Sequence, residues 1–92
     1  MKINFYATLR QITQERTVDF DLPQTPSVRE LVEIVVTRYP PMRRELLNAD
    51  GELYPHVHVF VNGRDAPYLT DGMDTIVNST DKISIFPAVG GG

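Results

Sequence analysis

The sequence predicts an α+β fold in which one main helix packs on one face of a mixed sheet of four to five strands. Two segments of alternating hydrophobicity open the chain, a capped amphipathic segment follows, and two further β-rich segments close it. The 92 residues are 41% hydrophobic and 23% charged. Such a composition suits one compact globular domain, which we place at residues 1–92.

The first half of this pattern predicts a β-hairpin. Every second residue is apolar between residues 2 and 9, and the same period returns between residues 17 and 22. A period of two is typical of half-buried strands, because successive side chains point to opposite faces of the sheet. We expect the two strands to be joined by a polar loop over residues 10–16.

The main helix is expected to begin after Ser27. Ser27 and Glu30 have the spacing of a capping box, in which each side chain accepts a hydrogen bond from a free backbone amide. Apolar residues then recur at helical spacing and form one stripe: Val28, Leu31, Val32, Val35 and Tyr39. Pro40 and Pro41 end the helix. A short second helical turn is expected to carry Met42, Leu46 and Leu47.

Two strand signals follow in the second half of the chain. Residues 57–61 are β-branched or aromatic except His58, and they precede Asn62-Gly63, a pair that suits a tight hairpin turn. We expect them to form a central strand. Residues 82–86 alternate again and form the last predicted strand. The order strand, strand, helix, strand, strand predicts a ubiquitin-like β-grasp.

The sheet face away from the helix is expected to be aromatic. Val57, Val59 and Val61 should point into the core, which leaves a second set on the other face: Tyr6, His58, Phe60 and Phe86. His56 and His58 should share that wetter face, at a spacing that a pair of metal ligands can have. The sequence offers no recognisable third ligand, so we predict no metal site. We interpret Asp71, Asp74 and Asp81 as turn residues.

Composition also argues against several classes of function. The chain has 12 acidic and 9 basic side chains and a net charge of −3, so we expect no nucleic-acid partner. It has no cysteine, which excludes disulfides, zinc-thiolate sites and a cysteine nucleophile. No apolar run reaches membrane-spanning length and no signal peptide is recognisable, so we expect no membrane partner and a cytoplasmic location.

The C-terminal sequence is the most informative segment. Pro87 follows the last predicted strand, and Gly90, Gly91 and Gly92 close the sequence. Glycine has no side chain to bury and a high entropic cost of ordering, so three in a row contribute little to folding. A tail without Cβ atoms can, however, be threaded as an extended strand into a narrow channel. We expect residues 88–92 to form such a flexible tail.

Residues 83–92 closely resemble the ending of a family of sulfur carriers. The family includes the small subunit of molybdopterin synthase (MoaD), the thiamin-pathway carrier (ThiS) and the carrier of a cysteine-forming pathway. Gly90 stands where the family usually has alanine or threonine, so Gly91 and Gly92 take the functional positions. Residues 78–82 depart from the family's usual turn. Three upstream segments resemble the opening strand, the helix start and the third strand: residues 5–10, 27–31 and 59–63.

The resemblance implies a carrier that is not itself an enzyme. A partner adenylating enzyme of the E1 type would activate the Gly92 carboxylate with ATP, and a sulfur donor would displace AMP to leave a thiocarboxylate. The chain would bind no cofactor, since ATP and zinc would belong to the partner. A synthase or large subunit would accept the sulfur. The resemblance also implies a set of partner-binding residues: Tyr6, Phe60, Phe86, Pro87, Ala88, Val89 and Gly90.

Several functions remain open at this point. The length and ending are more similar to the molybdopterin or cysteine-pathway members than to the shorter thiamin carrier. The activated Gly92 can also be conjugated to lysines of target proteins, as in ubiquitin-like modifiers. A third alternative is a non-catalytic β-grasp interaction module with an incidental tail.

Overall fold

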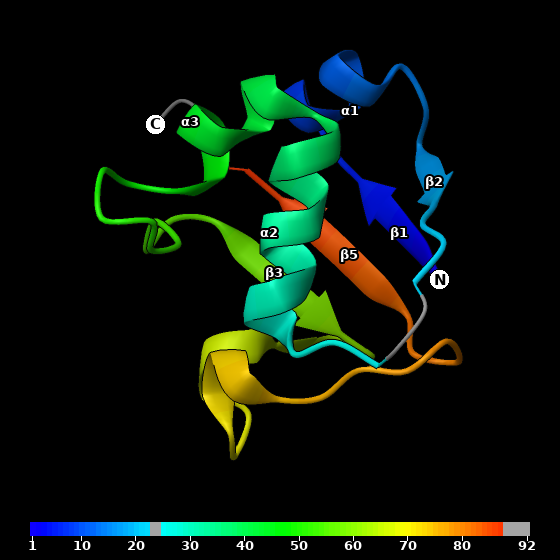
Figure 1. The fold of residues 1–92 in the computed structure, drawn as a ribbon, viewed down its shortest axis with the longest axis vertical. Coiled ribbons are helices and arrows are strands. Elements are labelled where there is room, and N and C mark those ends of the chain that lie inside the picture. The colour runs from blue at the N-terminus through cyan, green and yellow to red at the C-terminus, as the bar shows by residue number, and fades with distance from the viewer. Residues whose placement is uncertain (23–24, 88–92) are drawn as a thin grey trace.

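The computed structural model describes residues 1–22 and 25–87 (Figure 1). Within these residues one mixed sheet has five strands in the order β2-β1-β5-β3-β4. Their bounds are β1 Lys2–Phe5, β2 Thr17–Asp19, β3 His58–Val61, β4 Arg64–Asp65 and β5 Ile83–Phe86. β1 and β5 run parallel, whereas the other neighbours are antiparallel. Helix α2, Val28–Arg38, crosses one face of this sheet, as the α+β prediction requires.

Helix α2 begins at the predicted capping box. The Glu30 amide donates to Ser27 Oγ at 3.1 Å, and the Ser27 amide donates to Glu30 Oε1 at 2.9 Å. These two bonds satisfy backbone donors that have no partner inside the helix. After Tyr39 the chain passes through the 3₁₀ helix η1, Pro40–Met42, into helix α3, Arg43–Leu46. The second helical turn predicted from the sequence is therefore present.

The core lies between α2 and the sheet. The helix contributes Val28, Leu31, Val32, Val35 and Val36, all buried. Each of the longer strands contributes alternate residues, such as Ile3 and Phe5 of β1 and Ile83 and Ile85 of β5, all with 0% exposure. Met42 and Leu46 close the end of the core beneath η1 and α3. The apolar residues of the helix and of the strands therefore pack against one another in one layer.

The predicted hairpin loop is wrong, because a helix replaces it. β1 ends at Phe5 rather than at residue 9, and helix α1 occupies Thr8–Thr13. Ala7 has a positive φ of 54°, which turns the chain out of the strand. Leu9 is buried in the core, but it belongs to helix α1 and not to strand β1. β2 is also shorter than expected and ends at Asp19.

The second predicted turn is present and leads to an additional strand. Asn62 and Gly63 have φ of 52° and 87°, the positive values that a tight hairpin turn needs. They connect β3 to the short β4, which the sequence analysis did not predict. β3 is an internal strand between β5 and β4, while β5 occupies the middle position.

A bilayer-spanning helix is not found in the described part of the chain. None of the helices within residues 1–22 and 25–87 combines the length and the apolar content that such a span requires.

The capping box makes a testable contribution to stability. Ser27→Ala removes the acceptor of the Glu30 amide, and we expect it to lower the free energy of unfolding by about 1 kcal/mol. The matched control is Ser79→Ala, an exposed turn residue, which should leave stability unchanged. Chemical denaturation of the three proteins measures the difference. Equal midpoints for Ser27→Ala and the unmodified chain would contradict this role of the cap.

Candidate partner-docking site

Four aromatic rings form a row across the sheet face turned away from α2. Tyr6 directly follows β1, Phe86 ends β5, and His58 and Phe60 belong to β3. Their side chains face outward because the residues that alternate with them on the strands are buried in the core. All four are partly exposed. We call this set the aromatic row. The outward positions of its four members agree with the sequence analysis.

The rings of the aromatic row are in contact with one another. Tyr6 and Phe86 stack with a centroid distance of 4.1 Å and an interplanar angle of 9°. Phe60 meets Phe86 edge to face at 5.3 Å, and His58 stacks on Phe60 at 5.8 Å. Such aromatic pairs contribute about 0.5–1.5 kcal/mol each beyond the area they bury. The row is therefore a fixed apolar surface rather than a group of free side chains.

Each end of the aromatic row carries a charged neighbour. The Arg10 guanidinium lies 5.6 Å from the centre of the Tyr6 ring, a cation–π contact made from α1. At the other end, His58 Nδ1 lies 2.6 Å from Asp65 Oδ2, and this contact orients the imidazole ring. Sequence reasoning missed both neighbours. The position of Asp65 could have been predicted from the sequence, because the register of a two-residue Asn62-Gly63 hairpin places Asp65 beside β3.

His56 does not share a strand face with His58, so this prediction is wrong. Pro55 and His56 form a turn before β3, and the Val57 amide closes it by donating to the Tyr54 carbonyl at 3.0 Å. The His56 ring instead stacks on Tyr54 at 5.0 Å. The sequence pattern could not distinguish this turn from an earlier start of the strand.

Asp71 and Asp81 lie in a turn and a bend, as interpreted from the sequence, whereas Asp74 ends a short 3₁₀ helix. Asp81 accepts hydrogen bonds from the Asn78 amide and from Asn62 Nδ2, both at 2.9 Å. Asp74 is the last residue of the 3₁₀ helix η3, Gly72–Asp74, and pairs with Arg29 at 3.3 Å, while Asp71 directly precedes this helix. Across residues 1–22 and 25–87 no three His, Cys, Asp or Glu side chains are grouped as metal ligands.

The aromatic row is continuous in sequence with the predicted tail. Phe86 is followed by Pro87, which is buried. Five of the predicted site residues lie outside the described residues: Ala88, Val89, Gly90, Gly91 and Gly92. The structure therefore brings together Tyr6, Phe60 and Phe86 of the predicted partner-binding set, whereas Pro87 is buried directly after them in the chain.

The sheet order, the single long helix across it and the aromatic outer face define a ubiquitin-like β-grasp protein within the described residues. The model of the ThiS family matches residues 3–92, and the chain belongs to that family. Small archaeal modifier protein 3 of Haloferax volcanii is 32% identical over 92 residues, which are 100% of this chain and 98% of that protein.

Solved structures of similar proteins have the same fold. Small archaeal modifier protein 1 of Haloferax volcanii superposes with a TM-score of 0.83 at 27% identity, over 99% of this chain and 97% of that one. A chain of the BexX/CysO complex of Amycolatopsis orientalis gives 0.78 at 26% identity, over 99% and 98%. The β-grasp prediction and the resemblance to sulfur carriers are confirmed. Relatives of this kind also confirm the prediction that the chain is not an enzyme.

Proposed function

We propose that this chain is a sulfur carrier whose Gly92 carboxylate is converted to a thiocarboxylate by an E1-like adenylating partner. The observation that carries the proposal is the family match, which extends through residue 92 and so includes the three glycines. The aromatic row supports it with a surface suited to a partner. Neither the row nor the described residues around it supply a cysteine nucleophile or a grouped metal site.

The chemistry needs only the carboxylate from this chain. A Gly92 oxygen would attack the α-phosphorus of ATP on the partner, releasing pyrophosphate and forming an acyl adenylate. A sulfur nucleophile would then attack the acyl carbon, and AMP would leave with the bonding electrons. With sulfide as the nucleophile, loss of its proton to solvent leaves the thiocarboxylate, and no change of oxidation state is needed. We propose that the acceptor belongs to molybdopterin or cysteine formation and that the cycle is cytoplasmic.

We propose that the partner docks on the aromatic row, within reach of the reacting group. Six residues separate Phe86 from the end of Gly92. Fully extended, they span roughly 20 Å. A partner docked on the row would thus have its nucleotide site within that distance. Stacked, partly exposed rings lose little conformational entropy on binding, which favours them as interface anchors.

The first prediction concerns the mass of the chain. Incubation with a cognate activating enzyme, ATP and sulfide should raise the intact mass by about 16 Da, because one carboxylate oxygen is replaced by sulfur. Intact-protein mass spectrometry measures the change. A chain lacking Gly91 and Gly92 is the control and should gain nothing. An unchanged mass with every cognate enzyme tested would refute the carrier proposal, and an equal gain in the truncated chain would refute the role of Gly92.

The second prediction concerns docking. Tyr6→Ala and Phe86→Ala should each lower kcat/KM for adenylation of this chain by about tenfold, because each removes a stacked anchor. Pyrophosphate release measures the rate. Ile76→Ala is the control, since Ile76 is 60% exposed and lies outside the row. If the control and the row variants react at the same rate, the partner docks elsewhere.

Conjugation to lysine is a second candidate, favoured by the names of two full-length relatives, small archaeal modifier proteins 3 and 1. A lysine ε-amine would attack the same acyl carbon and form an isopeptide bond. Both fates share the activation step.

The third prediction distinguishes these fates. Lys82 is the last basic residue, so trypsin would leave residues 83–92 attached to any target lysine. Peptide mass spectrometry of cells that express the chain should detect this branched remnant if conjugation occurs. The chain lacking Gly91 and Gly92 should leave none. Thiocarboxylate without any remnant would identify a carrier only.

A further inference from the structure

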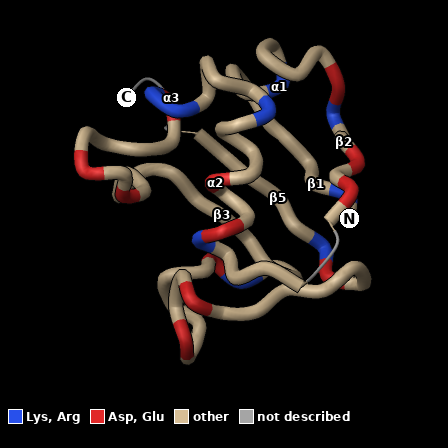
Figure 2. Tube along the Cα trace, viewed as in Figure 1, with Lys and Arg blue, Asp and Glu red and all other residues tan. Residues whose placement is uncertain are grey.

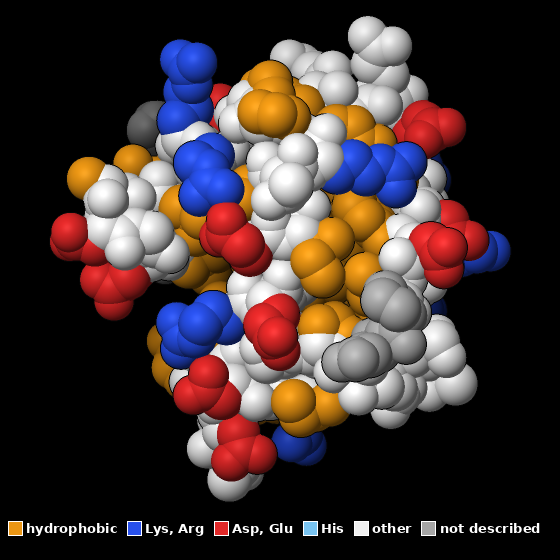
Figure 3. All heavy atoms as spheres, viewed as in Figure 1, with side chains coloured by type: hydrophobic (Ala, Val, Ile, Leu, Met, Phe, Trp, Pro, Cys, Tyr) orange, Lys and Arg blue, Asp and Glu red, His pale blue; other side chains and the backbone are white. Residues whose placement is uncertain are grey.

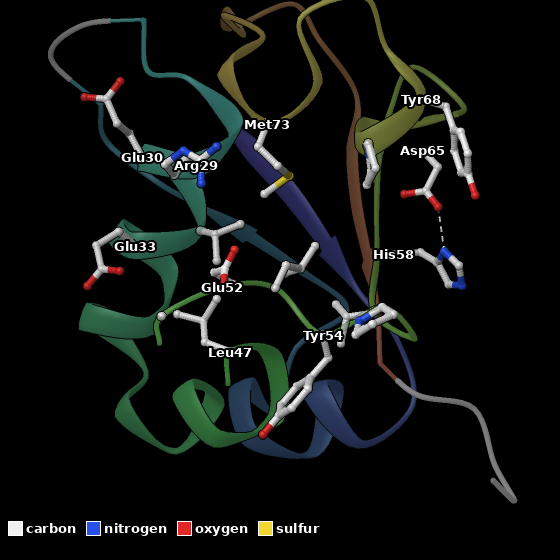
Figure 4. A pocket seen from close by; sticks show the side chains of 16 residues that line it. Arg29, Glu30, Glu33, Leu47, Glu52, Tyr54, His58, Asp65, Tyr68 and Met73 are labelled. Carbon is white, nitrogen blue, oxygen red and sulfur yellow. Dashed lines mark hydrogen bonds and ion pairs between the residues drawn. The ribbon is translucent and has the colours of Figure 1, made fainter. Parts of the chain in front are cut away.

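A groove of about 730 Å³ lies beside α2, at the sheet edge formed by β4. The loop after α3 bounds it on one side, and the 3₁₀ helices η2, Ala66–Tyr68, and η3, Gly72–Asp74, bound it on the other (Figure 4). Its floor is apolar: Val32, Leu47, Leu53, Val57 and Met73. Figure 3 shows hydrophobic side chains recessed between two lobes on the left of the view. The volume is in the range of sites that hold a ligand or a few inserted side chains.

The charged residues of the groove are mostly acidic. Four carboxylate residues line it: Glu30, Glu33, Glu52 and Asp65. Arg29 is the one Lys or Arg among its described lining residues and pairs with Asp74 at 3.3 Å, while Glu33 pairs with Arg43 at 2.7 Å. Glu30 Oε1 accepts from the Ser27 amide, and Glu52 is exposed without an ion pair in the described structure, so the lining stays acidic on balance. Figure 2 shows acidic residues on α2 and on the loop after α3. A groove with this charge favours a cationic ligand and disfavours nucleic acid or an anionic membrane.

Asp65 is a largely buried carboxylate in the wall of this groove. Its side chain is 14% exposed, and Oδ2 is taken by His58 at 2.6 Å. Oδ1 is buried and has no hydrogen-bond partner among the described residues. In Figure 4 this second oxygen is turned toward the interior of the groove. Asp65 therefore adds negative charge to the wall of the groove without exposing a free oxygen at its surface.

Tyr68 adds an exposed aromatic surface at the rim. Its exposure of 88% is higher than that of the other exposed large hydrophobic residue among those described, Ile76 at 60%. Tyr54 lies across the groove from it (Figure 4). A tyrosine ring attracts ammonium and guanidinium groups through its negative face. Exposed aromatic residues at the edge of a hollow are typical of protein interfaces.

We propose that this groove binds a segment of a partner protein in which a lysine or arginine stands beside a large apolar side chain. The apolar side chain would lie on the floor near Leu53 and Met73. The basic group would contact the Tyr68 ring at the rim, where the acidic lining of the groove attracts it. Among the residues that line the groove, only His58 also belongs to the aromatic row. Binding here does not require Gly92, so it can be tested apart from the carrier chemistry.

The test begins with selection of phage-displayed random peptides on the full chain. Enriched peptides, labelled with fluorescein and titrated by anisotropy, should carry Lys or Arg next to Leu, Phe or Met. Tyr68→Ala and Glu52→Lys should each weaken binding about tenfold, and added salt should weaken it further. The matched controls are Ile76→Ala and Glu15→Lys, exposed residues outside the groove. Both should bind as the unmodified chain does.

The variants are chosen to keep the fold intact. Tyr68 and Glu52 are exposed, and no side-chain hydrogen bond of either is present in the described structure. Unchanged denaturation midpoints confirm that each variant is folded. The proposal is overturned if the enriched peptides are acidic or neutral, or if none is enriched. It is also overturned if Phe60→Ala, in the aromatic row, abolishes binding while Tyr68→Ala and Glu52→Lys do not.

Discussion

The burial of the α2 stripe against β1, β5 and β3 is the contact on which the positions of both surfaces depend. Full burial of a large aliphatic side chain contributes about 1.5–3 kcal/mol, and α2 buries five apolar residues on the sheet. Because this contact uses alternate residues of each strand, the residues between them must face away. The aromatic row is therefore a geometric consequence of core packing. A register slip of one residue would turn the rings inward.

The sequence predicted those elements in which local pattern and tertiary contact agree. The capping box marks the helix start, and the alternation in β1, β3 and β5 predicts the strand residues that the structure buries. Four of the five residues in the predicted helical stripe are buried, whereas Tyr39 is only partly buried and Val36 takes its place in the core. The α1 segment escaped prediction because Leu9 fits either a strand or a helix period. What decides between them is the positive φ of Ala7, which follows from the fold and has no sequence signature.

The candidate site was predictable to a similar extent. Ring positions follow from strand alternation, so Tyr6, Phe60 and Phe86 were assigned to the correct face. The Arg10 contact was not predictable, since Arg10 comes from the unpredicted α1, whereas the Asp65 contact follows from the register of the predicted Asn62-Gly63 turn and was missed. The groove depends on segments that come together only in the fold. In particular, the loop after α3 and the 3₁₀ helices after β4 show no periodic pattern that would place them side by side.

The position of β5 has a consequence for how the protein is made. β5 pairs with β1 and β3 in the middle of the described sheet, yet it is the last of these strands along the chain. The central strand of the sheet is therefore synthesised after the two strands that flank it. Until residue 86 emerges, β1 and β3 lack the strand that joins them, and closing the long β1–β5 loop slows folding. The aromatic row, which needs Phe86, therefore forms only when this last of the described strands joins the sheet.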